Sequence, residues 1–185
     1  MVEKIMIKNT LSTYGYLAKF FHWSMALIFI AMFTVAYIMI NIPKSEFRYT
    51  LYDLHKATGI LLFCLVVLRL SWRLHNIQPA LSGFVPVWQK HAAQWNIATL
   101  YFFMFAMPTT GFLTSTLGGH DISFYNIFII SPWAHDKSAS GFFSQAHEIL
   151  SYLLIVAFVI HVMGAIYHHY SLKDNIFKRM WIHQP

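Results

Sequence analysis

The chain has 185 residues, of which 57% are apolar, 18% aromatic and only 11% charged. Soluble globular proteins have about 25% charged residues, so this composition excludes an ordinary water-soluble fold and indicates an integral membrane protein. The formal charge of +6 is therefore interpreted as a signal of membrane topology, and nucleic-acid binding is not expected.

Four apolar stretches are long enough to cross a bilayer, which takes roughly 20 helical residues. They run approximately from Lys19 to Ile40, His55 to Leu74, Trp95 to Leu117 and Glu148 to Ser171. The expected helices cover about 13–40, 48–75, 91–117 and 141–171. Because 185 residues leave no room for a second folded domain, we expect a single domain over residues 1–185. The predicted fold is all-α, an integral membrane four-helix bundle with up-down-up-down topology.

The first two stretches each carry a histidine among apolar residues. The first contains His22, is too long for the apolar region of a secretory signal, and is expected to be a retained helix. The second begins at His55 and is the least apolar of the four, since it runs uninterrupted only between Lys56 and Arg69.

The third stretch and the loop after it contain residues that break helices. Pro108, followed by Gly111, is expected to bend the third helix or to free a carbonyl, either beside a cofactor or as a tolerated proline. The loop from Gly118 to Ala146 is long enough to cover the outer end of the bundle. Its aromatic residues favour packing at the membrane interface over disorder.

The fourth stretch carries two histidines fourteen residues apart, His147 and His161. Fourteen steps of about 100° fall about 40° short of four turns, so both rings lie near one face of the helix. At about 1.5 Å per residue they are roughly 21 Å apart along the axis, which suits two stacked sites better than one.

Depth in the membrane pairs these four histidines. His22 lies early on a helix that runs outward and His161 late on one that runs inward, so both are in the cytoplasmic half. His55 and His147 lie at the outer ends of their helices. Paired imidazoles without a further ligand are typical of six-coordinate haem used for electron transfer. Zinc is the rival metal, but a closed zinc site takes four ligands.

Other residues near these pairs suit a haem. Gly59 lies one turn after His55 and Gly164 three residues after His161, where a flat macrocycle needs a bare helix surface; ordinary packing of membrane helices is the alternative. Arg69 and Arg73 project on the face of His55 and can pair with haem propionates, or simply satisfy the preference for positive charge inside.

His168 lies seven residues after His161, on the same stripe and nearer the cytoplasm. It is a candidate quinone contact or proton donor, and a merely interfacial histidine is the alternative.

Lysine and arginine are unequally divided between the two sides of the predicted membrane. One side has Lys4, Lys8, Lys19, Arg69, Arg73, Lys90, Lys173, Lys178 and Arg179, and the other has Lys44, Arg48, Lys56 and Lys137. The excess predicts that the first side is cytoplasmic, with both termini inside.

Several motifs together resemble the bacterial di-haem cytochrome b561 family of the inner membrane. They are His22-Trp23, His55-Lys56-Ala-Thr-Gly59 to Leu68-Arg69-Leu-Ser-Trp-Arg73, His147-Glu148 to His161, and Tyr167-His168-His169-Tyr170 followed by Lys173-Asp174-Asn175 and Arg179-Met180. The similarity covers nearly the whole chain. One departure is that Gln94 and Ile97 stand where the family often has His-x-x-His, with His91 a turn earlier.

The resemblance implies two non-covalent b haems, held by His22 with His161 and by His55 with His147. It also implies a quinone-reducing oxidoreductase, which takes electrons from a small periplasmic donor, superoxide included, and passes them to ubiquinone. Because Gln94 and Ile97 replace the two histidines, the resemblance implies no role for a third-helix histidine pair in this chain. Expected contacts are membrane lipid, quinone and the donor, with a homodimer or a partner redox subunit left open.

Two alternatives remain. The chain can be the cytochrome b membrane anchor of a larger hydrogenase- or dehydrogenase-type complex, without a substrate of its own. It can also be a haem-free transporter or metal-binding module whose buried histidines serve as proton or ion sites.

Overall fold

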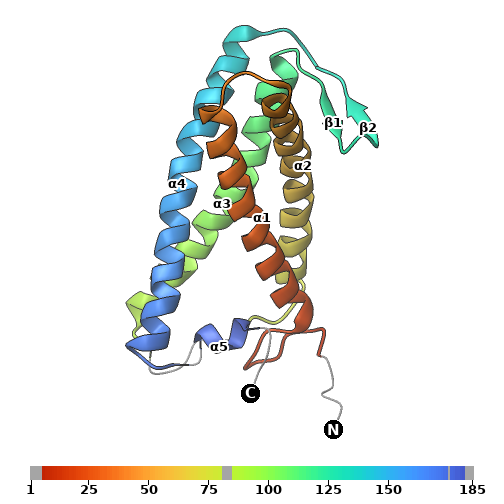
Figure 1. Ribbon diagram of the computed structural model, residues 1–185. Helices are drawn as coiled ribbons and strands as arrows, with labels where there is room; N and C mark the ends of the chain where they lie inside the picture. Colours follow the sequence, from red (N-terminus) through yellow and green to blue (C-terminus); the bar gives the residue numbers. More distant parts are fainter. Residues whose placement is uncertain (1–5, 81–84, 175, 182–185) are drawn as a thin grey trace.

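The structure, a computed structural model, describes residues 6–80, 85–174 and 176–181 (Figure 1). Its elements are α1 (Tyr16–Asn41), α2 (Glu46–Leu74), α3 (Val87–Leu117), β1 (Ile122–Phe124), β2 (Phe128–Ile130), α4 (Lys137–Tyr170) and α5 (Ile176–Met180). Helices α1, α2, α3 and α4 are each long and apolar enough to cross a membrane. The predicted fold class is therefore confirmed. Lys4, part of the predicted charge asymmetry, and Asn175, part of the family motif, lie outside the described residues.

Successive long helices run in opposite directions, so the topology is up-down-up-down (Figure 1). The most extensive packing is between α3 and α4, and α2 packs against both α1 and α3. The α1–α2 and α3–α4 connections lie at one end of the bundle, at the top of Figure 1, and α5 lies at the other. These ends are called the outer and the inner end below.

A small apolar cluster occupies the middle of the bundle. Met25 of α1, Val66 of α2 and Met104 of α3 are buried together, and partly buried apolar side chains surround them. Met25 lies three residues outward of His22, and Val66 three residues outward of Arg69. The cluster therefore packs just outward of His22.

The helices α2, α3 and α4 begin earlier than the apolar pattern indicates, because polar residues and proline set their starts. Ser45 precedes α2, and its side chain accepts a hydrogen bond from the backbone N–H of Arg48. Asp136 precedes α4 and accepts from Ser138 and Ala139. Pro86 is the residue before α3. Such caps satisfy the free N–H groups of a first turn, whether or not that turn is apolar.

A β-hairpin that the sequence did not reveal lies in the connection between α3 and α4. Strands β1 and β2 are antiparallel, with Phe124 opposite Phe128. The turn between them uses positive φ angles at Tyr125 and Asn126. Hydrogen bonds from Lys56 Nζ to the Asp121 carbonyl, and between Thr58 and the Tyr125 hydroxyl, fix the hairpin beside α2. Strands of three residues are too short to give a periodic signal.

Candidate cofactor-binding site

The first pair of histidines, called the inner pair, is brought together by α1 and α4. His22 of α1 and His161 of α4 have ring centroids 6.1 Å apart. Two imidazoles that bind one metal from opposite sides, at about 2.0 Å each, have ring centres roughly 6 Å apart. The spacing of this pair therefore fits a single metal between the rings.

The outer pair has nearly the same spacing. His55 of α2 and His147 of α4 have ring centroids 6.3 Å apart. No hydrogen bond to a described residue fixes the buried Nδ1 of His55, so either of its ring nitrogens can present a lone pair. The structure thus joins both predicted pairs at two depths, while their role as ligands stays a prediction.

The imidazole of His147 is oriented by the backbone of α3. Its Nδ1 lies 2.9 Å from the Met107 carbonyl oxygen and 3.2 Å from Oγ1 of Thr110. A carbonyl can only accept, so Nδ1 carries the proton and donates it. The lone pair is then on Nε2. This is the arrangement in which a metal-binding histidine is held by a hydrogen bond from its other nitrogen.

Gly111 gives the ring of His147 room against α3. A Cβ atom at this position would lie 2.9 Å from Cε1 and 3.1 Å from Nδ1 of His147. Real Cβ atoms have almost no contacts this close, so a side chain here would displace the imidazole. The sequence showed Gly111 only as a partner of Pro108 in breaking the helix. No sequence pattern indicated that Met107, Thr110 and Gly111 together contact and orient the ring of His147.

Arg69 lies against the inner pair. Its Nη2 donates to Nδ1 of His22 at 3.0 Å, and its Cζ lies 5.6 Å from the ring centroid of Tyr101. Among the described residues, no carboxylate forms an ion pair with Arg69. If His22 binds a metal through Nε2, its Nδ1 takes the proton and can no longer accept. Arg69 is then free to pair with an anionic group.

Arg73 does not join this site in the same way. Its Nη1 donates to Oε1 of Gln78 at 2.9 Å, and the Gln78 side chain in turn donates to the Arg73 carbonyl. These contacts tie Arg73 to the residues that follow the inner end of α2. Of the two arginines predicted to pair with haem propionates, Arg69 is therefore the stronger candidate.

The two predicted glycines border empty space. A Cβ atom added to Gly59 or to Gly164 would meet no atom within 4 Å. Gly59 is one turn from His55 and Gly164 is three residues from His161. Neither glycine therefore places a side chain in the way of a flat group beside its histidine, and Gly164 lies at the surface of the chain.

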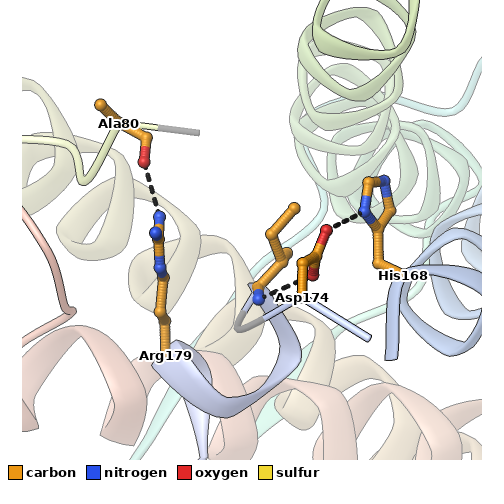
Figure 2. Close-up of polar contacts among 5 residues, drawn as sticks. Ala80, His168, Asp174 and Arg179 are labelled. Atoms are coloured by element: carbon orange, nitrogen blue, oxygen red, sulfur yellow. Dashed lines mark hydrogen bonds and ion pairs between the residues drawn. The ribbon is translucent and has the colours of Figure 1, made fainter. Parts of the chain in front are cut away.

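His168 forms a close pair that the sequence did not indicate. Its Nδ1 lies 2.6 Å from Oδ2 of Asp174, and the two side chains are only 15% and 16% exposed (Figure 2). Oδ1 of Asp174 accepts from the backbone N–H of Ile176, at the start of α5. The carboxylate is therefore held by the turn between α4 and α5, with one oxygen directed at the imidazole.

Hydrogen bonds and a ring contact hold the short helix α5 across the inner end of the bundle. The indole N–H of Trp23 donates to the Met180 carbonyl at 2.8 Å, and Trp23 and Trp181 pack edge to face. Arg179 donates to the Ala80 carbonyl at 2.6 Å (Figure 2). Trp23 directly follows His22, so α5 packs close to the inner pair.

Other candidate positions do not enter these clusters. His91 and Gln94 of α3 are exposed, and Ile97 is partly buried. Among the described residues, no group of three or more histidine, cysteine or acidic side chains could hold a metal ion. The donor set at each depth is thus a pair of imidazoles, which fits an axially ligated haem and is too small for a closed zinc site.

Comparisons with known proteins agree with these features. The sequence profile of a protein family described as prokaryotic cytochrome b561 matches residues 13–182. Cytochrome b561 homolog 2 of Escherichia coli (strain K12) is 33% identical over 175 residues, which are 93% of this chain and 93% of that protein. Cytochrome b561 homolog 1 of the same organism is 30% identical over 167 residues, 87% of this chain and 92% of the relative.

Proposed function

The chain belongs to the prokaryotic cytochrome b561 family, and from this premise we propose that it carries electrons from a small periplasmic donor, with superoxide as the candidate, to ubiquinone in the membrane. Membership makes the protein a multi-pass membrane oxidoreductase that uses b-type haem. The observation that carries the finer proposal is the presence of two histidine pairs, each spaced for one metal, at two depths of the bundle.

A bound haem supplies reversible one-electron reduction at its iron. In the proposal, His22 and His161 hold one haem in the inner half, and His55 and His147 hold a second in the outer half. The hydrogen bond from His147 to the Met107 carbonyl presents Nε2 to the metal. A haem held by two histidines would serve electron transfer.

Arg69, Arg73, Gly59 and Gly164 complete the binding residues in this proposal. Arg69 lies among apolar helices and forms no ion pair with a carboxylate of the described residues, so its guanidinium suits the propionates of the inner haem. Arg73 contributes less, because Gln78 already engages it. The open space at Gly59 and Gly164 admits the flat face of a macrocycle.

Positive charge at the outer end is weak support for an anionic donor. Lys56 is paired with Asp53 at 2.8 Å, and Arg48 donates to the Ile42 carbonyl. Lys44 and Lys137 are exposed. We therefore expect only modest electrostatic attraction of superoxide.

The excess of basic residues at the inner end supports a bacterial inner-membrane orientation with both termini in the cytoplasm. In this orientation the pair of His55 and His147 is near the periplasmic side, and the pair of His22 and His161 near the cytoplasmic side. The whole chain would then act as one membrane-spanning unit.

His168 is proposed as the quinone contact and proton donor at the inner end. The Asp174 carboxylate lies 2.6 Å from Nδ1 of His168 and orients the ring. We expect His168→Ala to lower quinone reduction at least tenfold, which is below the usual contribution of a general acid of about 10²–10⁴. Single-turnover reduction of a ubiquinone analogue by the reduced protein measures this. His169→Ala is the matched control, and an unchanged rate in His168→Ala would remove the assignment.

The proposal as a whole is tested by a reduced-minus-oxidised spectrum of the detergent-purified protein, with haem quantified per chain. We expect two b-type haems per polypeptide and reduction of added ubiquinone. One haem would contradict the pairing of four histidines, and none would favour the haem-free alternative. Two haems without quinone reduction, together with a copurified iron–sulfur partner, would favour the membrane-anchor alternative.

A further inference from the structure

The two histidine pairs are electrostatically unequal. At the inner pair, the Arg69 guanidinium is 3.0 Å from Nδ1 of His22. At the outer pair, no hydrogen bond or ion pair among the described residues joins an arginine or lysine to either ring, and the Nδ1–H of His147 donates to the Met107 carbonyl oxygen. The inner site thus has a positive charge where the outer site has the negative end of a dipole.

A fixed positive charge favours the reduced state of a nearby redox group, because reduction removes one positive charge. A guanidinium stays protonated in proteins, so Arg69 keeps its charge throughout the redox cycle. Its charge acts over several ångströms among apolar helices, where the effective dielectric constant is lower than in water. If Arg69 pairs with a propionate, it cancels a negative charge that would otherwise favour oxidation. Whether Arg69 stays beside His22 or pairs with a propionate, its charge raises the reduction potential at the inner site.

The contact at the outer site acts in the opposite direction. A hydrogen bond from Nδ1–H to a carbonyl makes the imidazole more basic toward a metal on Nε2. A more basic ligand stabilises the oxidised metal, so the contact with Met107 lowers the reduction potential of a haem bound there.

We propose that this asymmetry makes the inner haem site the one of higher potential and so sets the direction of electron flow inward. The inference rests on the proposed function, because it needs a haem at each pair. One electron passing inward oxidises the group at the outer pair and reduces the group at the inner pair, with no covalent bond made or broken. Arg69 is a positioned charge in this inference, and it is not a ligand.

A spectroelectrochemical titration of the purified holoprotein tests the inference. We expect two midpoint potentials, and the His161→Ala protein should keep only the lower one. Arg69→Gln should lower the upper potential by the equivalent of about a tenfold change in the equilibrium constant, which is about 59 mV for one electron. The lower potential should move much less. Arg69→Lys, which keeps the charge, should retain most of the upper potential.

Arg73→Gln is the matched control, because it removes the same charge one turn further inward, where the side chain contacts Gln78. It should shift the upper potential clearly less than Arg69→Gln does. A lower potential at the inner site, or equal shifts of both potentials in Arg69→Gln, would overturn the inference. If Arg69→Gln does not fold, the order of the two wild-type potentials and the upper potential of the Arg69→Lys protein still test the inference. Fewer than two haems per chain would overturn the proposed function itself, whereas two haems in the reverse order would overturn this inference alone.

Discussion

His161→Ala should yield a folded membrane protein with one b haem per chain in place of two. His161 contributes only to the inner pair, where its ring lies opposite His22. A haem at the inner pair would be left with one protein ligand in place of two, whereas the rings of His55 and His147 would still lie with their centroids 6.3 Å apart. Haem per chain and the shape of the reduced α-band measure the outcome.

Variants elsewhere on α4 make this result specific. His147→Ala should remove the other haem, and the double variant should be colourless. His169→Ala is the control, because His169 packs on Tyr170 and Phe177 and belongs to neither pair. A His161→Ala protein that retains two six-coordinate haems would show that the inner pair is assigned wrongly. Loss of both haems would show that the two sites do not form independently.

The pairing of the histidines could be predicted because it depends on helix geometry alone. A rise of about 1.5 Å per residue converts sequence position into depth once the apolar stretches fix the membrane. This conversion predicts one depth for His22 and His161, and the structure has their ring centroids 6.1 Å apart. The same conversion predicts the other depth for His55 and His147, whose ring centroids lie 6.3 Å apart.

The residues that orient these histidines could not be predicted, because they depend on how each helix is rotated against its neighbour. Thr110 and Gly111 face His147 only because α3 and α4 pack closely along their lengths. Asp174 reaches His168 through a turn in which Lys173 has a positive φ angle, and no periodic pattern indicates such a turn. The sequence likewise did not separate Arg69 from Arg73, since the local contact of Arg73 with Gln78 lies beyond the helix.

Gly111→Ala should weaken haem binding at the outer pair and leave the inner pair intact. The new methyl carbon would lie 2.9 Å from Cε1 and 3.1 Å from Nδ1 of His147, so the ring must move away from α3. In a protein without haem the imidazole can move aside at the cost of its hydrogen bond to the Met107 carbonyl alone. A ring held at one end by a metal and at the other by the Met107 carbonyl cannot move without losing one of these contacts. Overpacking of this kind costs about 1–3 kcal/mol.

An energy of this size lowers haem affinity roughly 5- to 150-fold, since about 1.4 kcal/mol corresponds to a factor of ten. Transfer of haem from the purified protein to an excess of a haem-scavenging apoprotein measures the change. The Gly111→Ala protein should show one fast and one slow phase where the wild type is uniformly slow. Gly141→Ala is the matched control, because it adds the same methyl group to α4 at a position where no atom lies within 4 Å. Equal release from the Gly111→Ala and Gly141→Ala proteins would mean that His147 does not hold its cofactor against α3, and the outer site would then have to be built without this helix.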